Sequence, residues 1–390
     1  MSDSSAGRPR EGVLLALLAF GNFIVGMGAF VVVGIVSPMA DGLGIAKADA
    51  AVVLTTYAFA YALLSPIAAT ITGQLPRRIV LATALSIFCI GTIISALSPN
   101  LLMLAASRII VALGASMFTP LAAGVAIAVS APEHRGKALS TVFNGLTLAQ
   151  VIGTPCGAWL AYHFGWAMAF WAVAALAAAG AAIVFLTVPR DVKFQASGMH
   201  AIIDVLKDGR TMFAIAFTAT FITALTIVFA FFGPLTEESV GSNPEIRTFF
   251  LVLYGVGAVL GNHFGGLLTD RIGGRGTLAI LCLAQIAIMP FFSIVPLGPV
   301  AFAILVGTWS AFAWSFMAPQ QSRLVLIAPQ AISVVLALNA AMIYVGIAVG
   351  SALASRILGW QGLASLGIAG AIGCVVALLH LLLSGKPAAR

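Results

Sequence analysis

The sequence carries little charge: Asp, Glu, Lys and Arg make up 8% of its 390 residues, while 61% of the residues are hydrophobic. In soluble domains roughly a quarter of the residues are charged, and the mean hydropathy here is +1.10. A soluble fold cannot hide this much apolar surface, whereas helices of about 20 apolar residues satisfy their backbone hydrogen bonds within a bilayer. The composition excludes an ordinary soluble protein and predicts an all-α integral membrane protein.

Other features are also scarce, and each scarcity excludes a class of protein. The net charge of +7 is spread over short loops rather than one basic run, so nucleic-acid binding is not expected. The phosphate-binding pattern G-x-x-x-x-G-K-[ST] does not occur, so any transport must draw on a gradient. Four cysteines lie in apolar segments, and we expect them to pack as small hydrophobic side chains rather than to form disulfides or bind a metal. They are Cys89, Cys156, Cys282 and Cys374. No cofactor is expected.

Twelve apolar segments are present, separated by short stretches that contain Pro, Gly or charge, and each is long enough to cross a bilayer. The first follows Arg8 and Arg10, and we expect it to be a retained span rather than a cleaved signal peptide. The expected spans are 13–38, 50–72, 79–97, 101–128, 137–161, 166–188, 211–233, 247–268, 277–295, 299–321, 331–355 and 360–383.

Lys and Arg are concentrated on alternate loops, and in membrane proteins such residues are enriched on the cytoplasmic side. With the N-terminus in the cytoplasm, only Lys47, Arg247 and Arg356 fall outside. The pattern predicts a multi-pass plasma-membrane or inner-membrane protein, expected to be monomeric, with both termini cytoplasmic. The basic residues then inside are Arg8, Arg10, Arg77, Arg78, Arg135, Lys137, Arg190, Lys193, Lys207, Arg210, Arg271, Arg275, Arg323, Lys386 and Arg390.

The longest polar stretch divides the chain nearly in half. Its apolar residues at 202–206 lie among charges and predict a short amphipathic helix on the membrane surface. The expected organisation is an N-terminal six-helix bundle over 1–188, a cytoplasmic linker over 189–210 and a C-terminal six-helix bundle over 211–390.

The two halves repeat. Matching features recur at offsets of 194 to 197 residues: Asn144 with Asn339, Trp166 with Trp360, Arg77 with Arg271, and Pro132 with Pro329. Four pairs at nearly one offset indicate two pseudo-symmetric halves in the same orientation. Parallel halves around a midplane site are an architecture of secondary transporters.

Three motifs carry a resemblance to a known family. They are GLLTDRIGGR at 266–275, Arg108 ahead of Gly114 in the fourth span, and GTPCG at 153–157 in the fifth span. With these motifs the chain resembles the major facilitator superfamily, and within it the drug:proton antiporter branch, similar to arabinose/sugar efflux and chloramphenicol-resistance exporters. The resemblance covers nearly the whole chain and implies the twelve-helix fold of that superfamily.

The first motif implies a gate. The resemblance assigns Asp270, with Gly266, Arg271, Gly273 and Arg275, to a latch that closes the inner side when the protein faces outward. A carboxylate at a helix end complements the dipole of a neighbouring helix N-terminus, and we expect a partner near residues 136–137. The corresponding loop, with Arg77 and Arg78, has Pro76 where the carboxylate would be, so the latch is expected on one side only. The alternative is a basic loop that only sets orientation.

The fourth and fifth spans each offer a functional and a structural interpretation. A buried Arg108 costs several kcal/mol unless it is paired or faces water. We expect it to serve the substrate or the coupling step; the alternative is a structural residue that reaches outward to water. Gly153, Pro155 and Gly157 loosen the fifth span and allow close helix approach. The resemblance places them between the halves, where they limit leakage; the alternative is an ordinary packing kink.

A proton carrier is not evident from the sequence. Relatives often carry an acidic residue near the segment 26–30, but this chain has none there, and none of its twelve acids is securely at mid-membrane. His263 in the eighth span is one candidate, because histidine is the usual proton carrier among side chains at physiological pH; the alternative is a neutral, hydrogen-bonded histidine. Glu237, beyond the Gly233–Pro234 break, is the other candidate, although a solvated loop is the favoured interpretation of its position.

The resemblance also indicates which spans line a central cavity, and aromatic walls with a few amides suit a small amphipathic molecule. We therefore expect export of a small molecule (a drug-like compound, sugar or metabolite) by alternating access, in exchange for protons. The alternative is a uniporter or uptake transporter without proton antiport; a membrane sensor or enzyme is the least favoured. The candidate cavity residues are Asn22, Tyr57, Tyr61, Arg108, Phe118, Phe143, Asn144, Gln150, Phe221, Tyr254, Trp309, Trp314, Asn339 and Tyr344.

Overall fold

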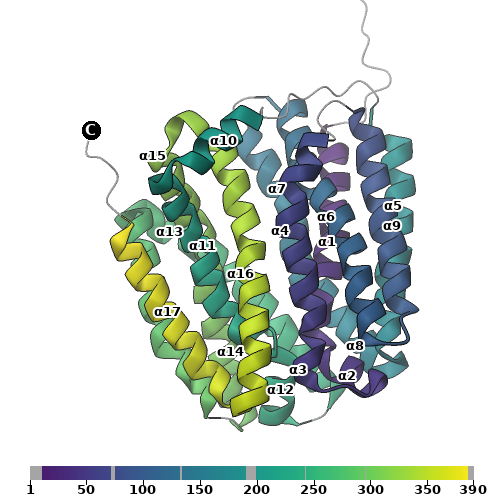
Figure 1. The fold of residues 1–390 in the computed structure, drawn as a ribbon, viewed down its shortest axis with the longest axis vertical. Coiled ribbons are helices and arrows are strands. Elements are labelled where there is room, and N and C mark those ends of the chain that lie inside the picture. Colours follow the sequence, from purple (N-terminus) through teal and green to yellow (C-terminus); the bar gives the residue numbers. More distant parts are fainter. Residues whose placement is uncertain are drawn as a thin grey trace, which may run out of the picture.

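A computed structural model describes residues 11–71, 75–131, 134–189, 199–241, 243–294 and 296–384, and these residues form helices joined by short loops (Figure 1). The helices are α1 (Glu11–Gly34), α2 (Val36–Leu43), α3 (Lys47–Ala50), α4 (Val52–Ile71), α5 (Arg77–Ala96), α6 (Leu101–Val129), α7 (Arg135–Leu148), η2 (Ala149–Gly153), α8 (Thr154–Phe164), α9 (Trp166–Thr187), α10 (Met199–Lys207), α11 (Gly209–Phe229), α12 (Phe232–Val240), α13 (Pro244–Ile288), η3 (Met289–Ser293), α14 (Pro299–Trp314), α15 (Met317–Ile327), η4 (Pro329–Ala331), α16 (Ile332–Gln361) and α17 (Ser365–Leu383).

Prolines account for the breaks within spans, because a proline ring clashes with the carbonyl four residues earlier and removes one helical hydrogen bond. Pro38 lies four residues after Gly34, where α1 ends, and Pro234 lies four after Ala230, between α11 and α12. Pro319 has the same relation to the break between α14 and α15. Pro155 follows the π-helical turn η2, which interrupts the fifth span.

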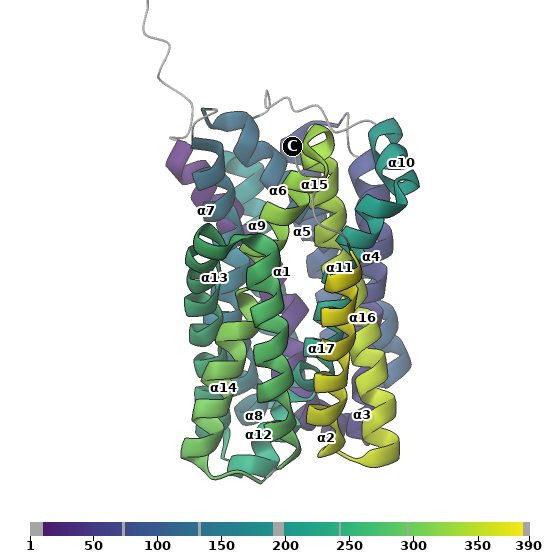
Figure 2. The same ribbon diagram turned by 90° about the vertical axis from the view of Figure 1, so that its left-hand side faces the viewer.

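The twelve expected passes are present, and among the described residues ten helical stretches, some of them with a break, are long and apolar enough to cross a membrane. The fifth pass is the composite of α7, η2 and α8, which the broken helix divides into short pieces. The eighth and ninth passes both lie in α13, whose two arms meet at Gly273 (Figure 2). Gly273 adopts φ 77°, ψ 161°, a conformation that glycine reaches without steric cost. The expected surface helix in the linker corresponds to α10.

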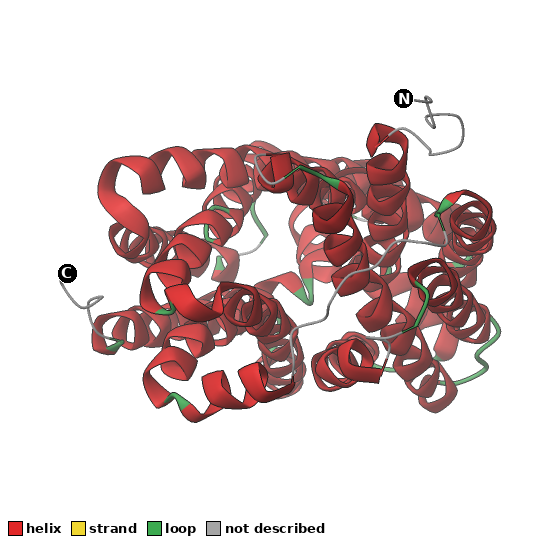
Figure 3. Ribbon diagram, turned by 90° about the horizontal axis from the view of Figure 1, so that it is seen from above, coloured by secondary structure: helices red, strands yellow, loops and turns green. Residues whose placement is uncertain are grey.

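The helices form two groups that lie side by side (Figures 1 and 3). We call α1 to α9 the N group and α10 to α17 the C group. In Figure 1 the top of the molecule, where α7, α10 and α15 lie, is called the α10 end, and the bottom, with α2, α3 and α12, the α12 end. The predicted boundaries of the two bundles stay a prediction.

In each group a buried asparagine joins three helices. Asn22 of α1 donates to the carbonyl of Val142 (3.0 Å) and accepts from Thr119 (2.9 Å). In the C group, Asn339 of α16 accepts from Thr218 and from Gln320, so it likewise joins three helices. Buried amides with satisfied hydrogen bonds fix the relative position of helices in an apolar core.

Candidate functional site

Glu237 of α12 lies at the centre of a polar contact between the two groups. Its carboxylate accepts from the Ser37 hydroxyl (2.7 Å) and from the Lys47 ammonium (3.1 Å), both in the N group. Arg247 of α13 lies 3.5 Å from the other carboxylate oxygen. Several charge-assisted hydrogen bonds to one carboxylate stabilise a contact more than a single exposed ion pair does. We call Ser37, Lys47, Glu237 and Arg247 the α12-end clasp.

A second set of contacts surrounds the α12-end clasp. The Arg247 guanidinium lies 4.6 Å from the centre of the Tyr162 ring of the N group, a cation–π distance. His163 of α8 lies 3.6 Å from Glu245 of α13. Ser355 of α16 donates to the carbonyl of Ala48 (2.8 Å), so α16 is also joined to the N group at this end.

The backbones of the two groups approach closely where glycines lie. A Cβ placed on Gly255 of α13 would lie 2.5 Å from the Cα of Val151, and one on Gly233 would lie 3.1 Å from the carbonyl oxygen of Val33. Neither position has room for a side chain without displacement of the opposing backbone. Small residues of this kind let membrane helices approach and exclude lipid and water from the contact.

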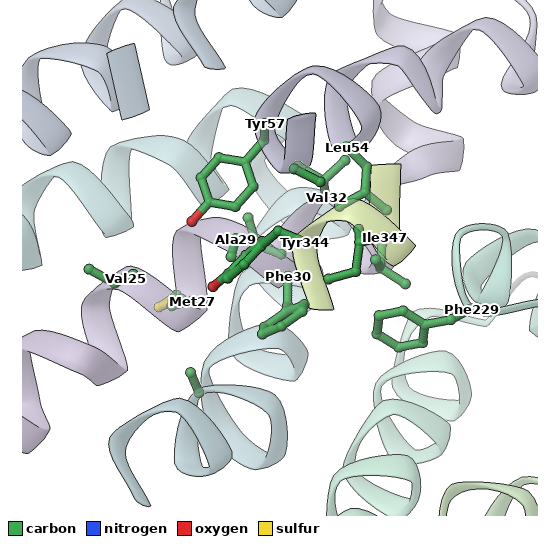
Figure 4. Packing of buried hydrophobic residues seen from close by; sticks show 14 of the residues in the cluster. Val25, Met27, Ala29, Phe30, Val32, Leu54, Tyr57, Phe229, Tyr344 and Ile347 are labelled. Atoms are coloured by element: carbon green, nitrogen blue, oxygen red, sulfur yellow. The ribbon is translucent and has the colours of Figure 1, made fainter. Parts of the chain in front are cut away.

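Tyrosines form the next layer toward the middle of the spans. Tyr61 of α4 stacks on Tyr344 of α16, with ring centres 3.6 Å apart, and Tyr57 packs edge-on against Tyr344. Figure 4 shows the hydroxyl groups of Tyr57 and Tyr344 on the same side, with Phe30 and Phe229 drawn in the same cluster. Phe30 in turn packs edge-on against Phe229 of the C group. Three predicted cavity residues therefore meet at the boundary between the groups.

Arg108 of α6 is fully buried inside the N group, close to this layer. It donates to the carbonyl of Gly28 (2.6 Å), and its guanidinium lies 4.8 Å from the centre of the Tyr57 ring. Its Nε and Nη1 atoms have no hydrogen-bond partner in the described part of the chain, and the Tyr57 hydroxyl has none either. The alternative in which Arg108 reaches outward to water is wrong, because the side chain points into the group.

The C group contributes an aromatic cluster. Tyr254 of α13 accepts a hydrogen bond from Trp314 (2.8 Å) and packs against Trp309 and Phe229. Because Phe229 contacts Phe30 across the boundary, this cluster extends the tyrosine layer into the C group. Trp309 itself is fully buried.

The other predicted cavity residues fall into two sets. Asn22, Phe118, Phe221 and Asn339 are buried within one group, and Gln150 is buried in η2. Phe143 and Asn144 of α7 are exposed. The part that each plays in a substrate cavity stays a prediction.

The fifth-span motif lies between α1 and α13. Gly157 faces Val31 of α1, where a Cβ would lie 2.3 Å from a side-chain methyl group, and Gly153 faces Met27. The neighbouring turn η2 and helix α8 contact α13 of the C group. Pro155 is buried. The motif thus lies beside the boundary between the groups, and its predicted role in limiting leakage stays a prediction.

The predicted inner latch lies at the opposite end of the molecule. Asp270 and Arg271 are exposed, and Asp270 has no ion-pair partner among the described residues. Arg275 donates to the carbonyl of Leu382 (2.9 Å) at the end of α17. Cations near a helix C-terminus satisfy its free carbonyl groups and complement its dipole. Of the other gate residues, Gly266 has open space around it, Arg77 is buried, and Arg78 lies 4.5 Å from the centre of the Phe185 ring.

The two candidate proton carriers differ in their surroundings. His263 of α13 is exposed. Glu237 does not lie in a solvated loop, as favoured from the sequence: it lies in α12, its side chain is only 26% exposed, and it has partners in both groups. The loop interpretation is wrong for Glu237 because the chain beyond the Gly233–Pro234 break continues as a helix, and only the neighbouring Glu238 is exposed on it.

Sequence reasoning missed the partners of Glu237. Ser37, Tyr162 and the His163–Glu245 pair carry no motif that distinguishes them from other polar residues. One signal was present: Lys47 and Arg247 are two of the three basic residues that violate the charge asymmetry of the loops. Both lie in the α12-end clasp, so a specific carboxylate partner explains their position.

Comparison with known proteins defines the class. The family model described as Major Facilitator Superfamily matches residues 18–351, so the chain belongs to this superfamily of membrane transporters. The uncharacterized MFS-type transporter YbcL of Bacillus subtilis (strain 168) is 27% identical to this chain, and the alignment covers 94% of each protein. The inner membrane transport protein YdhP of Escherichia coli (strain K12) is 28% identical, over 95% of this chain and 96% of that protein.

Solved structures support the same fold. A bacterial homolog of the human lysosomal transporter Spinster, in an inward-facing and occupied conformation, superposes with a TM-score of 0.75 at 16% sequence identity. The match covers 98% of each chain. The protein is therefore a multi-pass membrane transporter of the major facilitator fold.

Proposed function

We propose that this transporter exports a small molecule by alternating access, and that the structure corresponds to the state open toward the cytoplasm. The observation that carries this proposal is the position of the contacts between the groups. Within the described residues, the hydrogen bonds, ion pairs and ring contacts that join the groups lie between the middle of the spans and the α12 end. The Lys and Arg bias places the α10 end in the cytoplasm of the plasma or inner membrane.

The two carboxylates support this assignment. Glu237 at the outer end is bound to both groups, while Asp270 at the inner end is exposed and has no partner among the described residues. A latch that closes the inner side in the outward-facing state is expected to be released in the opposite state. The tyrosine layer then forms the outer wall of the substrate site, and its stacked rings suit an amphipathic small molecule.

Exchange for protons is the second part of the proposal. The residue that carries the proton must be one whose protonation shifts the conformational equilibrium in the direction that antiport requires. Two cations stabilise the charged form of Glu237 when the outer end is closed. Protonation of Glu237 therefore favours the outward-open state, in which these pairs are broken. An antiporter needs a proton that favours return to the inward-open state. We therefore assign Glu237 to the outer gate, and the carrier role falls to His263.

The alternative function is transport without proton antiport, as a uniporter or an uptake system. It is favoured by one observation: the first span contains no acidic residue between Glu11 and Asp41. The two functions differ in a measurable way, because only antiport moves protons in proportion to substrate.

The test uses inverted membrane vesicles with an acidic lumen and a pH-sensitive dye. We expect antibiotics, dyes or sugars that are substrates to enter the lumen and make it more alkaline. His263→Gln should transport without alkalinisation, and Arg108→Ala should do neither; Arg108→Lys keeps the charge and controls for folding. Radiolabelled substrate that enters wild-type vesicles with no change in lumen pH would overturn proton antiport and favour the uniporter.

A further inference from the structure

The N group has a groove on its outer face, far from the boundary with the C group. Helices α5 and α9 pack side by side at the edge of the molecule (Figure 1). Between them lies a hollow of about 530 Å³. Its floor contains Ala82, Cys89 and Ala181, and its rims are Ile79, Ile90 and Phe185. We call this hollow the α5–α9 slot.

The helical spacing of these residues explains the shape of the slot. On α9, residues 178, 181, 182 and 185 follow the i, i+3, i+4, i+7 pattern of one helix face, and the first three are alanines. On α5, small residues repeat with the same spacing between Ile79 and Ile90. The two helices pack closely, and their small side chains fill little of the surface groove between the exposed Ile79, Ile90 and Phe185.

The slot matches one leaflet of a bilayer. Residues 79 to 90 span about 16 Å along the helix at roughly 1.5 Å per residue, and half of the hydrocarbon core is about 15 Å. Two of its three polar side chains have partners within the protein: the Ser86 hydroxyl donates to the carbonyl of Ala82 (2.9 Å) and the Cys89 thiol to that of Ala174 (3.3 Å). The lining therefore suits an acyl chain.

A positive charge lies at the end of the slot that faces the membrane surface. The Arg78 guanidinium lies 4.5 Å from the centre of the Phe185 ring, so it is directly beside the rim. Its Nε atom is buried without a hydrogen-bond partner, and Arg78 has no ion-pair partner in the described part of the chain. Pro76, which precedes α5, supplies no side-chain cap to the helix N-terminus.

We propose that the α5–α9 slot binds one acyl chain of an anionic phospholipid, whose phosphate contacts Arg78. Basic pockets between membrane helices are a known form of acidic-lipid site. The occupant is a phospholipid rather than a protein helix, because the slot is the width of a gap between two adjacent helices and one leaflet deep.

The test is native mass spectrometry of the intact transporter with added phosphatidylglycerol or phosphatidylcholine that have identical acyl chains. We expect wild type to prefer phosphatidylglycerol. Arg78→Gln should lower the affinity of the transporter for phosphatidylglycerol about fivefold, which corresponds to the loss of one basic residue near a headgroup. The affinity for phosphatidylcholine should not change. Lys207→Gln, which removes an exposed charge at the same end, is the matched control and should have no effect.

A second pair of variants tests the acyl chain. Ala178→Phe fills the slot and should weaken both lipids, whereas Ala179→Phe, on the adjacent lipid-facing position, should weaken neither. If Ala178→Phe lowers thermal stability, Ala182→Leu serves the same purpose. Equal binding of the two lipids to wild type, or equal effects of the two Phe variants, would overturn the proposal. So would displacement of phosphatidylglycerol by inorganic phosphate alone, which would indicate a free-anion site.

Discussion

Glu237 and Asp270 belong to the same helix group but lie at opposite ends of it, and their surroundings differ. Glu237 has a hydroxyl and two cations around it, drawn from both groups. Asp270 is exposed and unpaired among the described residues. Under the proposed function, Glu237 holds the present state and Asp270 is available for the opposite state. Substitutions at the two ends test whether the two carboxylates act with opposite sign.

The largest effect is expected at the close backbone contact between α13 and the fifth span. A Cβ on Gly255 would lie 2.5 Å from the Cα of Val151 and 3.0 Å from the carbonyl oxygen of Gln150. Gly255→Ala should therefore separate α13 from the fifth span. We expect it to destabilise the state with a closed outer end by about 1–3 kcal/mol, which lowers the ratio of closed to open molecules by roughly 5- to 150-fold. Spin labels at the exposed residues Leu97 and Val300 measure the separation.

The control for this variant is Gly307→Ala on α14. Its new Cβ would meet only Leu253, at 3.8 Å, an ordinary contact distance. Replacement of glycine by alanine inside a helix is otherwise stabilising by roughly 0.5–1 kcal/mol. Gly307→Ala should leave the label distance unchanged, and equal distances in Gly255→Ala would show that the contact does not hold the outer end closed.

The next largest effect is expected for Glu237→Gln. Glutamine can still accept from Ser37, but it loses the charge that binds Lys47 and Arg247. Because these ion pairs are partly exposed, we expect the variant to destabilise the closed outer end by about 1 kcal/mol. The ratio of open to closed molecules should then rise roughly fivefold. Glu238→Gln, which removes the exposed neighbouring charge, should leave the label distances unchanged.

Lower external pH should shift wild type in the same direction as Glu237→Gln, and the variant should lose this response. A response that persists in Glu237→Gln would assign it to another group, such as the His163–Glu245 pair at the same boundary.

A smaller effect, of opposite sign, is expected for Asp270→Asn. If Asp270 binds only when the inner end is closed, its loss should destabilise that state by roughly 0.3–1 kcal/mol. The same labels should then report fewer molecules with an open outer end. Asp204→Asn on α10 removes an exposed carboxylate at the same end and should have no effect. A shift toward the open outer end in Asp270→Asn would contradict the latch.

Much of this fold was predictable from sequence, because span length and hydropathy are set by the bilayer. Helix breaks were less predictable: Pro38 and Pro234 interrupt their spans, whereas Pro120 lies inside the continuous helix α6. Which outcome occurs depends on the packing around each proline.

The site was harder to predict than the fold. Ser37 and Glu237 are 200 residues apart, and Thr55 and Ser351 are 296 apart, yet each pair is hydrogen-bonded at 2.7 Å. No local pattern encodes such pairs, because they depend on how two separate bundles meet. Candidates identified by chemistry alone, such as Asn22 and Asn339, form hydrogen bonds within their own group, and their part in a cavity stays a prediction.

The smallest effect on the boundary should come from Asp208, which joins α10 to α11 within one group. Its carboxylate caps α11 by accepting from the backbone of Arg210 (3.1 Å) and from the Thr211 hydroxyl. The hydrogen bond from Thr211 is the main cause that holds the pKa of Asp208 below its ordinary value. A lowered pKa stabilises the folded state at neutral pH, and this contribution is lost as pH falls through the folded-state pKa.

Asp208→Ala should therefore lower the thermal stability of the protein at pH 7 by about 1 kcal/mol, the value of a typical N-cap. The difference from wild type in the unfolding midpoint should shrink as the pH is lowered toward 3. Because the cap touches only the C group, the distance between labels at Leu97 and Val300 should not change. A change in that distance would mean that the α10 end influences the α12-end clasp, and that the two ends do not act independently.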